Sequence, residues 1–358
     1  MTTYERSVAR LATGLFLSLA LSLVALFLVI DFGDWLRIYT GKPPGDVALL
    51  YWFRSHVALV QFAPAAMVLV GGLTVTVIRR RGEYTALKAL GASPWLILRP
   101  LLVFTLVASL GLIAFQEWVV SVSGPKIDRL MVERFDRWGD FLSVYSPRRW
   151  FRAGHWVLNV KGEVNPEQLN DVRLFEVDGA QGLKRWLEGD RLTWQSEGSW
   201  RLEGGREVQL DGAVVTASAS GVIEVPLPIR PEITRLASGR PEWLPLSTLR
   251  TQLEVMSALQ LPTESTRFAV HHRWAAALGA LLAAVLTALL AMADRARPSI
   301  PRALISGGVL YGVLFVAAMI SRSLALNSRL PPSAAAWLVP LVLLLLVVSV
   351  GRRAFRLS

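Results

Sequence analysis

The sequence predicts a membrane protein with six transmembrane helices and an all-β, jellyroll-like domain outside the membrane. Apolar residues make up 53% of the 358 residues, and the mean hydropathy is +0.43. Six apolar runs approach the roughly 20 residues that cross a hydrocarbon core. A polar stretch between the third and fourth runs contains short, partly alternating segments that are typical of β-strands.

The predicted spans cover residues 11–30, 57–78, 100–116, 274–293, 303–321 and 330–351. The first is too long for a cleavable signal peptide, and no small-residue cleavage site precedes Asp31. None of the six runs contains Asp, Glu, Lys, Arg or His. Carriers that are driven by protons or sodium ions place ionisable groups in mid-membrane. If this chain moves a substrate, we therefore expect the energy to come from outside the spans.

Lysine and arginine predict the orientation, because they accumulate in cytoplasmic segments. One side of the membrane holds both termini and most of the basic residues of the short segments, whereas the other side holds Arg37, Lys42, Arg54 and Arg329. We therefore expect cytoplasmic termini and an outer location for the domain at residues 119–268, between membrane parts 1–118 and 269–358. The net charge of +11 is then mainly a topological signal, and no nucleic-acid partner is expected.

The outer domain shows its β character from Phe141 onward, where strand-like runs alternate with turn residues. These runs are HWVLNVKG, DVRLFEVDG, DRLTWQSEG, SWRLEGG, REVQLDG and GVIEVPL. Several short strands at close spacing predict a small sandwich or jellyroll. A charged helical pattern at 123–138 precedes the strands, and a helix at 248–259 follows them.

A short polar helix is predicted at about 82–92, between the second and third spans. Gly82 and Glu83 suit its start, Lys88 lies in its last turn, and Gly91 and Pro94 end it. A helix of two turns is not stable alone in water. Its spacing puts Glu83, Ala86, Leu87 and Leu90 on one face. That face would either rest on lipid or dock in a groove of a soluble partner.

No catalytic, metal or cofactor site is predicted. The chain has no cysteine and no GxxxxGK[ST] phosphate loop, so it does not hold ATP in the usual P-loop way. Its four histidines lack metal-ligand spacing, and its serines lack a catalytic His and Asp context. The chain itself is therefore not expected to be an enzyme.

The segment RGEYTALKALGAS at 81–93 resembles the coupling helix of the LptF/LptG family. Members of this family are the paired permease subunits of the ABC transporter that exports lipopolysaccharide. The order of the helices and the outer β-domain agree, as do Glu117–Trp118 and the Pro331–Pro332 pair before the last helix. The segment IDFGDWLR at 30–37 is more similar to the LptG side of the pair.

This resemblance implies four partners: an ABC ATPase dimer that hydrolyses ATP, a second LptF/LptG-type permease, a periplasmic bridge protein, and lipopolysaccharide as the substrate. It places the chain in the inner membrane of a Gram-negative envelope, with the β-domain in the periplasm. Glu83 would pair with a basic residue of the ATPase, and the packing face would be formed by Ala86, Leu87, Ala89, Leu90 and Gly91.

On the outer side, the resemblance implies that Arg37 and Lys42 meet lipid phosphates. Asp31 departs from the pattern, because LptG-like chains often have a lysine there. Two other classes of protein stay open. One is a lipoprotein-releasing or mechanotransmitter permease, which usually has four spans. The other is a non-transporting envelope assembly or sensor protein.

Overall fold

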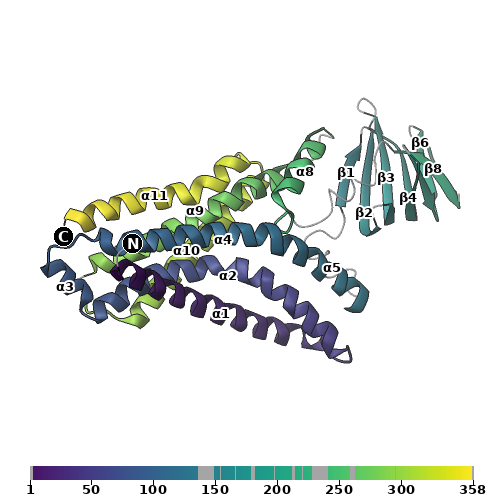
Figure 1. Ribbon diagram of the computed structural model, residues 1–358. Helices are drawn as coiled ribbons and strands as arrows, with labels where there is room; N and C mark the ends of the chain where they lie inside the picture. The colour runs from purple at the N-terminus through teal and green to yellow at the C-terminus, as the bar shows by residue number, and fades with distance from the viewer. Residues whose placement is uncertain are drawn as a thin grey trace. The chain divides into compact units, whose positions relative to one another are not determined.

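The computed structural model describes residues 3–135, 149–153, 155–165, 167–178, 182–196, 198–211, 214–219, 221–227, 241–258, 263–294 and 296–356. The chain divides into two compact units. The helical unit comprises Met1–Ile127 and Arg267–Ser358, and the second unit comprises Asp128–Thr266. Figure 1 shows the helices and strands with the labels used below.

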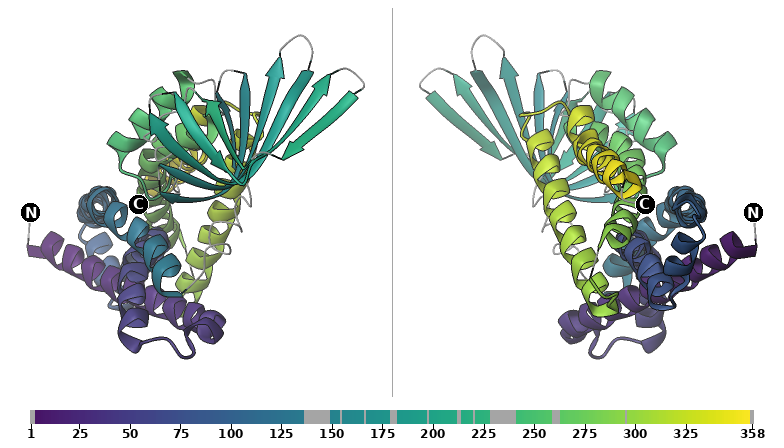
Figure 2. Two further views of the ribbon diagram at one scale, coloured as in Figure 1. Left: turned by 90° about the vertical axis from the view of Figure 1, so that its right-hand side faces the viewer. Right: turned by 90° about the vertical axis from the view of Figure 1, so that its left-hand side faces the viewer.

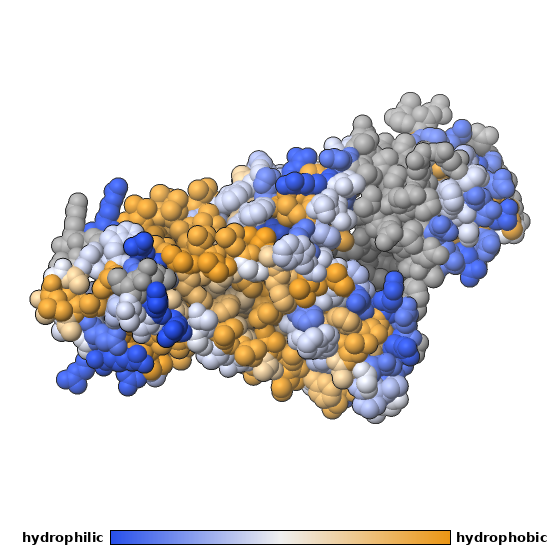
Figure 3. Space-filling model, in the orientation of Figure 1, coloured by the Kyte–Doolittle hydropathy of each residue, from blue (hydrophilic) through white to orange (hydrophobic). Residues whose placement is uncertain are grey.

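The helices with their bounds are α1 (Thr3–Tyr39), α2 (Pro44–Arg80), α3 (Glu83–Ala89), α4 (Trp95–Phe115), the π-helix η1 (Gln116–Val120), α5 (Ser121–Phe135), α8 (Leu246–Ala258), α9 (Glu264–Ala293), α10 (Ile300–Leu326) and α11 (Pro332–Arg356). Within the described residues, six helical segments are long and apolar enough to cross a membrane. The prediction of six spans is therefore confirmed. Figure 3 shows apolar side chains gathered over the middle of these helices.

Most spans are longer than the apolar runs that predicted them. α1 and α2 have 37 residues each, and the third span continues from α4 through η1 into α5. The helix predicted at 123–138 corresponds to α5, and the one predicted at 248–259 corresponds to α8. Residues 136–138 and 259 lie outside the described residues.

The interior of the helical unit is built mainly from α2 and α9. In each of these helices, 61% of the most apolar window is buried, compared with 11% in α1 and 6% in α10. Small residues let the two backbones approach closely, as is common between membrane helices. A Cβ atom built on Gly71 of α2 would lie 1.9 Å from the carbonyl oxygen of Ala284 of α9. Close by, the Thr287 hydroxyl donates to the carbonyl oxygen of Val68 at 2.8 Å.

The second unit contains an antiparallel sheet of strands β1 (Arg149–Ala153), β2 (Trp156–Asn165), β3 (Gln168–Asp178), β4 (Gly182–Ser196), β5 (Ser199–Glu203), β6 (Arg206–Asp211), β7 (Val214–Ala219) and β8 (Val222–Pro226). β6 pairs with the first half of β4, and β5 pairs with its second half. β7 in turn pairs with β6, and β8 pairs with β5. The described strands thus form a meander, which Figure 2 shows as a fan. The predicted all-β character of this domain is confirmed.

One face of the sheet carries the core. Leu158, Leu174 and Leu187 lie opposite one another on β2, β3 and β4, and all three are buried. Trp194 of β4 pairs with Trp200 of β5, and both side chains join the same cluster.

A kink changes which positions of β4 face the core. Leu187 and Leu192 both enter the core, although five residues of regular strand would place them on opposite faces. Between them lies Gly189, where a Cβ atom would meet Leu202 at 2.7 Å. Next to it, Gly204 has φ 66° and donates its N–H to Gly221 at 3.0 Å. Glycine therefore allows the strands to bend together and keep their pairing.

Candidate functional site

The ends of α3 follow from local turn chemistry. Gly82 precedes the helix with φ 76°, and Gly91 follows it with φ 69°. The Ala92 N–H donates to the Leu87 carbonyl at 2.9 Å, and the Gly91 N–H donates to the Lys88 carbonyl at 3.1 Å. These two bonds form the Schellman motif, in which glycine adopts the left-handed conformation at low cost. The helix is thus closed at the residue that its sequence indicates.

The side chains of α3 divide between an inner and an outer face. Tyr84 and Leu87 pack against a buried cluster formed by α1, α2, α4 and α9. Ala86, Ala89 and Leu90 are exposed, and the side chain of Leu90 reaches 82% exposure. The sequence pattern puts Leu87 on the docking face, whereas the structure places it on the anchoring face. The exposed group is therefore Ala86, Ala89, Leu90 and Gly91.

Glu83 lies at the start of α3, where a carboxylate interacts favourably with the helix dipole. Its carboxylate lies near the Arg81 guanidinium, with 3.7 Å between Nη1 and Oε1. The Glu83 side chain is 35% exposed and that of Arg81 is 58% exposed. A pair this open contributes little stability. The carboxylate can therefore exchange Arg81 for another cation at small cost.

Arg79, in the last turn of α2 just before α3, attaches this end of α2 to the end of α9. Its guanidinium donates to the carbonyl oxygens of Ala291 at 2.7 Å, Asp294 at 2.7 Å and Ala296 at 3.0 Å. The last turn of α9 has no basic residue of its own. Arg79 therefore satisfies carbonyl groups that a helix end leaves without intrahelical partners.

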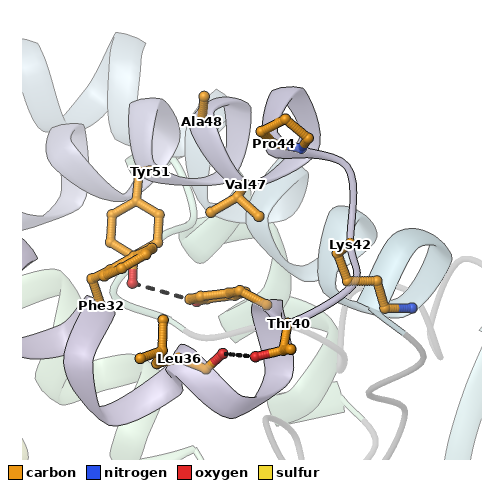
Figure 4. A pocket seen from close by; sticks show the side chains of 9 residues that line it. Phe32, Leu36, Thr40, Lys42, Pro44, Val47, Ala48 and Tyr51 are labelled. Carbon is orange, nitrogen blue, oxygen red and sulfur yellow. Dashed lines mark hydrogen bonds between the residues drawn. The ribbon is translucent and has the colours of Figure 1, made fainter.

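The second predicted site lies at the opposite end of the helical unit, at the turn between α1 and α2 (Figure 1). A pocket of about 450 Å³ opens between these helices. Its lining consists of Phe32, Leu36, Tyr39, Thr40, Lys42, Pro44, Val47, Ala48 and Tyr51. Figure 4 shows that most of these side chains lie between the two helices, with Lys42 on the connecting turn. The pocket is therefore apolar, with a basic residue at its edge.

Asp31 forms an internal ion pair and contacts Tyr51, one of the residues that line this pocket. Its carboxylate pairs with the guanidinium of Arg54, and the side chains of the two residues are 16% and 8% exposed. The Tyr51 hydroxyl donates to the same carboxylate oxygen at 2.8 Å. The Arg54 guanidinium also lies over the ring of Trp35, 5.4 Å from its centroid. Asp31 thus joins α1 to α2, and its charge is already neutralised within the chain.

The two predicted lipid-contact residues differ in position. Lys42 lines the pocket and is partly exposed. Arg37 is exposed, but it is not among the residues that line the pocket. The structure therefore brings Lys42, and not Arg37, to the pocket edge.

A second buried ion pair was not predicted from the sequence. Arg273 of α9 donates to Glu117 of η1 at 2.7 Å, and the Arg273 side chain is only 2% exposed. Glu117 directly follows one predicted span, and Arg273 directly precedes another. Opposite charges next to two neighbouring apolar runs are a signal that could have identified this pair. Its position in a π-helical turn is notable, since such turns are frequent at functional sites.

The described part of the chain contains no cluster of three or more His, Asp or Glu side chains that could hold a metal ion. Three charged contacts near the ends of the helical unit are instead internal: Asp31 pairs with Arg54, Glu117 pairs with Arg273, and Arg79 binds backbone carbonyls. Such an arrangement supports the positioning of helices.

Six membrane-length helices, a separate antiparallel β unit and a short polar helix after the second span define a multi-pass membrane protein. A comparison with family models makes the assignment more specific. The model of the lipopolysaccharide export system permease LptF/LptG matches residues 6–353. The chain belongs to this family and is therefore a permease of lipopolysaccharide export. A comparison with individually characterised proteins found no match.

Proposed function

We propose that this permease extracts lipopolysaccharide from the inner membrane and passes it to a periplasmic bridge protein. The energy comes from a separate ABC ATPase dimer, and a second LptF/LptG-type permease completes the membrane part. The chain itself hydrolyses no ATP. Family membership supports the export role, and the geometry of α3 supports the attachment of an ATPase.

The exposed face of α3 is the observation that carries this proposal. A seven-residue helix is too short to be stable alone. Tyr84 and Leu87 hold it against the helical unit, so Ala86, Ala89 and Leu90 stay available. Small residues beside one long apolar side chain fit a groove on a soluble protein. The adjacent carboxylate of Glu83 can then take a basic partner from that groove.

The arrangement of the ends supports the orientation. α3 and both chain termini lie at one end of the helical unit, whereas the α1–α2 turn lies at the other (Figure 1). The arginines of segment 79–81 belong to the first end, and basic residues favour the cytoplasm. We therefore place α3 and the termini in the cytoplasm, and the β unit in the periplasm.

The pocket between α1 and α2 supports a lipid contact on the periplasmic side. Its apolar lining suits an acyl chain, and the Lys42 ammonium suits a lipid phosphate. Arg37, exposed near the same end of α1, offers a second cation. Because Asp31 is paired with Arg54, its charge is offset at this contact.

Glu83→Ala tests the coupling role directly. The change should weaken association with the ATPase by at least about 30-fold, since truncating one partner of a buried, hydrogen-bonded charge pair in an interface costs about 2–5 kcal/mol. Co-purification of the ATPase and lipopolysaccharide release from proteoliposomes measure the effect. Thr85→Ala is the matched control, because Thr85 is exposed on the same helix. Normal ATPase binding and normal release in Glu83→Ala would contradict the proposal.

The lipoprotein-releasing alternative is disfavoured by a specific observation. Such permeases usually have four spans, whereas six membrane-length helices occur in the described residues. A non-transporting assembly protein would not need an exposed cytoplasmic helix of this kind. Purification without any nucleotide-binding subunit would favour that alternative.

A further inference from the structure

The ends of α1 and α2 at the proposed lipid contact carry equal numbers of acidic and basic side chains. Residues 30–55, which contain the turn between the two helices, include the bases Arg37, Lys42 and Arg54 and the acids Asp31, Asp34 and Asp46. The formal net charge of this segment is therefore zero, although the whole chain carries +11. A surface that binds several phosphates needs an excess of cations. The balance of charge therefore bears on which lipid this contact accepts.

Arg54 is withdrawn from the lipid. Its guanidinium pairs with the Asp31 carboxylate, and its side chain is only 8% exposed. It also lies 5.4 Å from the ring centroid of Trp35 and 5.6 Å from that of Tyr51. Arginine is well suited to hold a phosphate through two parallel hydrogen bonds. Taking Arg54 for a phosphate would leave the Asp31 carboxylate buried without its cation, which is costly.

The aromatic wall of the pocket offers a ligand few hydrogen bonds. The Tyr51 hydroxyl has a single proton, which it donates to Asp31 at 2.8 Å. The Tyr39 hydroxyl lies 3.4 Å from that of Tyr51. The rings of Phe32, Tyr39 and Tyr51 pack against one another with centroids 5.6–5.8 Å apart. The wall therefore suits an acyl chain and not a polar headgroup.

Lys42 is the basic side chain among the residues that line the pocket. Figure 4 shows its ammonium pointing away from the pocket interior, so the charge lies at the rim. Arg37 does not line the pocket, and Asp34, three residues earlier, lies on the same side of α1. Lys126 of α5 also approaches α2, but its ammonium lies over the ring of Phe53, which does not line the pocket. The rim thus presents one ammonium group.

We propose that this contact selects a glycolipid that carries a single phosphate there over one that carries two, with Asp31 as the specificity-determining residue. The inference rests on the function proposed above and specifies its substrate class. The acyl chain would enter the apolar pocket and one phosphate would meet Lys42 at the rim. A second phosphate would face Asp31 and Asp34 without a cation to spare, and such repulsive elements discriminate between ligands.

Binding of monophosphoryl and bisphosphoryl lipid A to the full chain tests the selection. Native mass spectrometry of the chain in detergent, titrated with each lipid, gives the two dissociation constants, and phosphatidylethanolamine serves as the reference lipid. We expect the monophosphoryl form to bind at least as tightly as the bisphosphoryl form, and both to bind more tightly than the reference. Tighter binding of the bisphosphoryl form by more than about two-fold would overturn the inference.

Asp31→Asn tests the residue. It leaves the positive charge of Arg54 without its acid, so the ratio of the two affinities should move toward the bisphosphoryl lipid by about ten-fold, the effect of one hydrogen bond to a charged group. Asp294→Asn is the matched control. It makes the same change in net charge at the opposite end of the helical unit (Figure 1), where Asp294 is partly exposed, and it should leave the ratio unchanged.

Asp34→Asn keeps the test decisive if Asp31→Asn does not fold. Asp34 is exposed on α1, so its replacement should leave the fold intact. The ratio should again move toward the bisphosphoryl lipid, by about two-fold or more, because an exposed charge has a smaller effect than a buried one. An unchanged ratio in every Asp31 or Asp34 variant that folds would overturn the assignment. An equal movement of the ratio in Asp294→Asn would overturn it too, because net charge alone would then explain the result.

The reference lipid separates this inference from the proposed function. If neither form of lipid A binds more tightly than phosphatidylethanolamine, the proposed lipid contact fails and the selection fails with it. If both bind more tightly but the bisphosphoryl form is preferred, only the selection fails. Glu83→Ala tests the attachment of the ATPase at the other end of the helical unit, and its result is independent of both.

Discussion

Replacing Gly71 with alanine should separate the two central helices of the membrane unit. The added Cβ atom would lie 1.9 Å from the Ala284 carbonyl oxygen and 2.5 Å from the Thr287 hydroxyl. Real Cβ atoms essentially never approach another atom within 3.0 Å. The obstructing atom is backbone, so α2 and α9 must move apart by about 1 Å, and such overpacking costs about 1–3 kcal/mol.

The separation has a second cost. The Thr287 hydroxyl donates to the Val68 carbonyl oxygen at 2.8 Å, and a hydrogen bond between membrane helices contributes about 0.6 kcal/mol on average. Alanine recovers roughly 0.5–1 kcal/mol of helix propensity, so we expect Gly71→Ala to lower the free energy of unfolding by about 1–3 kcal/mol. Reversible unfolding in mixed micelles with increasing SDS, followed by far-ultraviolet circular dichroism, measures the difference.

Gly14→Ala is the matched control. Gly14 lies in α1, and a Cβ atom there would meet nothing within 4 Å. Because alanine favours a helix over glycine by roughly 0.5–1 kcal/mol, this variant should be neutral or slightly more stable. If Gly71→Ala fell within about 0.5 kcal/mol of Gly14→Ala, the close contact between α2 and α9 would not be a determinant of stability.

Two other predictions concern charged groups. Arg79→Gln should lower the free energy of unfolding by about 1.5–3 kcal/mol, because it removes the hydrogen bonds that cap α9. Arg80→Gln, at an exposed position, should leave the free energy of unfolding unchanged. The micelle assay described above measures both variants. In the β unit, the Gln209 amide and then the Arg185 guanidinium hold the pKa of Glu207 below its ordinary value of 4.5. The stabilisation from Glu207 is therefore complete above pH 4.5 and is lost as the pH falls through the lowered pKa. Thermal melts of the full chain between pH 3 and 6 should show this loss, and Glu207→Gln should flatten it; an equal slope in both proteins would contradict the assignment.

Features with local causes were predictable from the sequence. The six spans follow from apolar length, and all six are present in the described residues. The left-handed glycines at Gly82 and Gly91 bound α3 as the turn chemistry indicates. The strands that carry Trp194 and Trp200 correspond to the runs DRLTWQSEG and SWRLEGG. In each case the residues that determine the feature are neighbours in the chain.

The candidate site was predictable only in part. The sequence locates the short helix and its carboxylate, but helical spacing groups Leu87 with the exposed residues, whereas it packs inward with Tyr84. A two-turn helix offers two overlapping apolar faces, and spacing does not distinguish which one meets a core. Similarly, nothing in the sequence around Asp31 predicts that Arg54, 23 residues further on, pairs with its carboxylate.

The sequence by itself determined the number of spans, the short helix between the second and third, and the β character of the outer part. These depend on hydrophobic length, turn residues and alternation, all of which act over a few residues. Tertiary structure alone decided that α2 and α9 form the interior, that Arg79 binds the carbonyl groups at the end of α9, and that Arg273 pairs with Glu117. Those contacts join residues far apart in the chain, and burial selects among side chains that the sequence presents as equivalent.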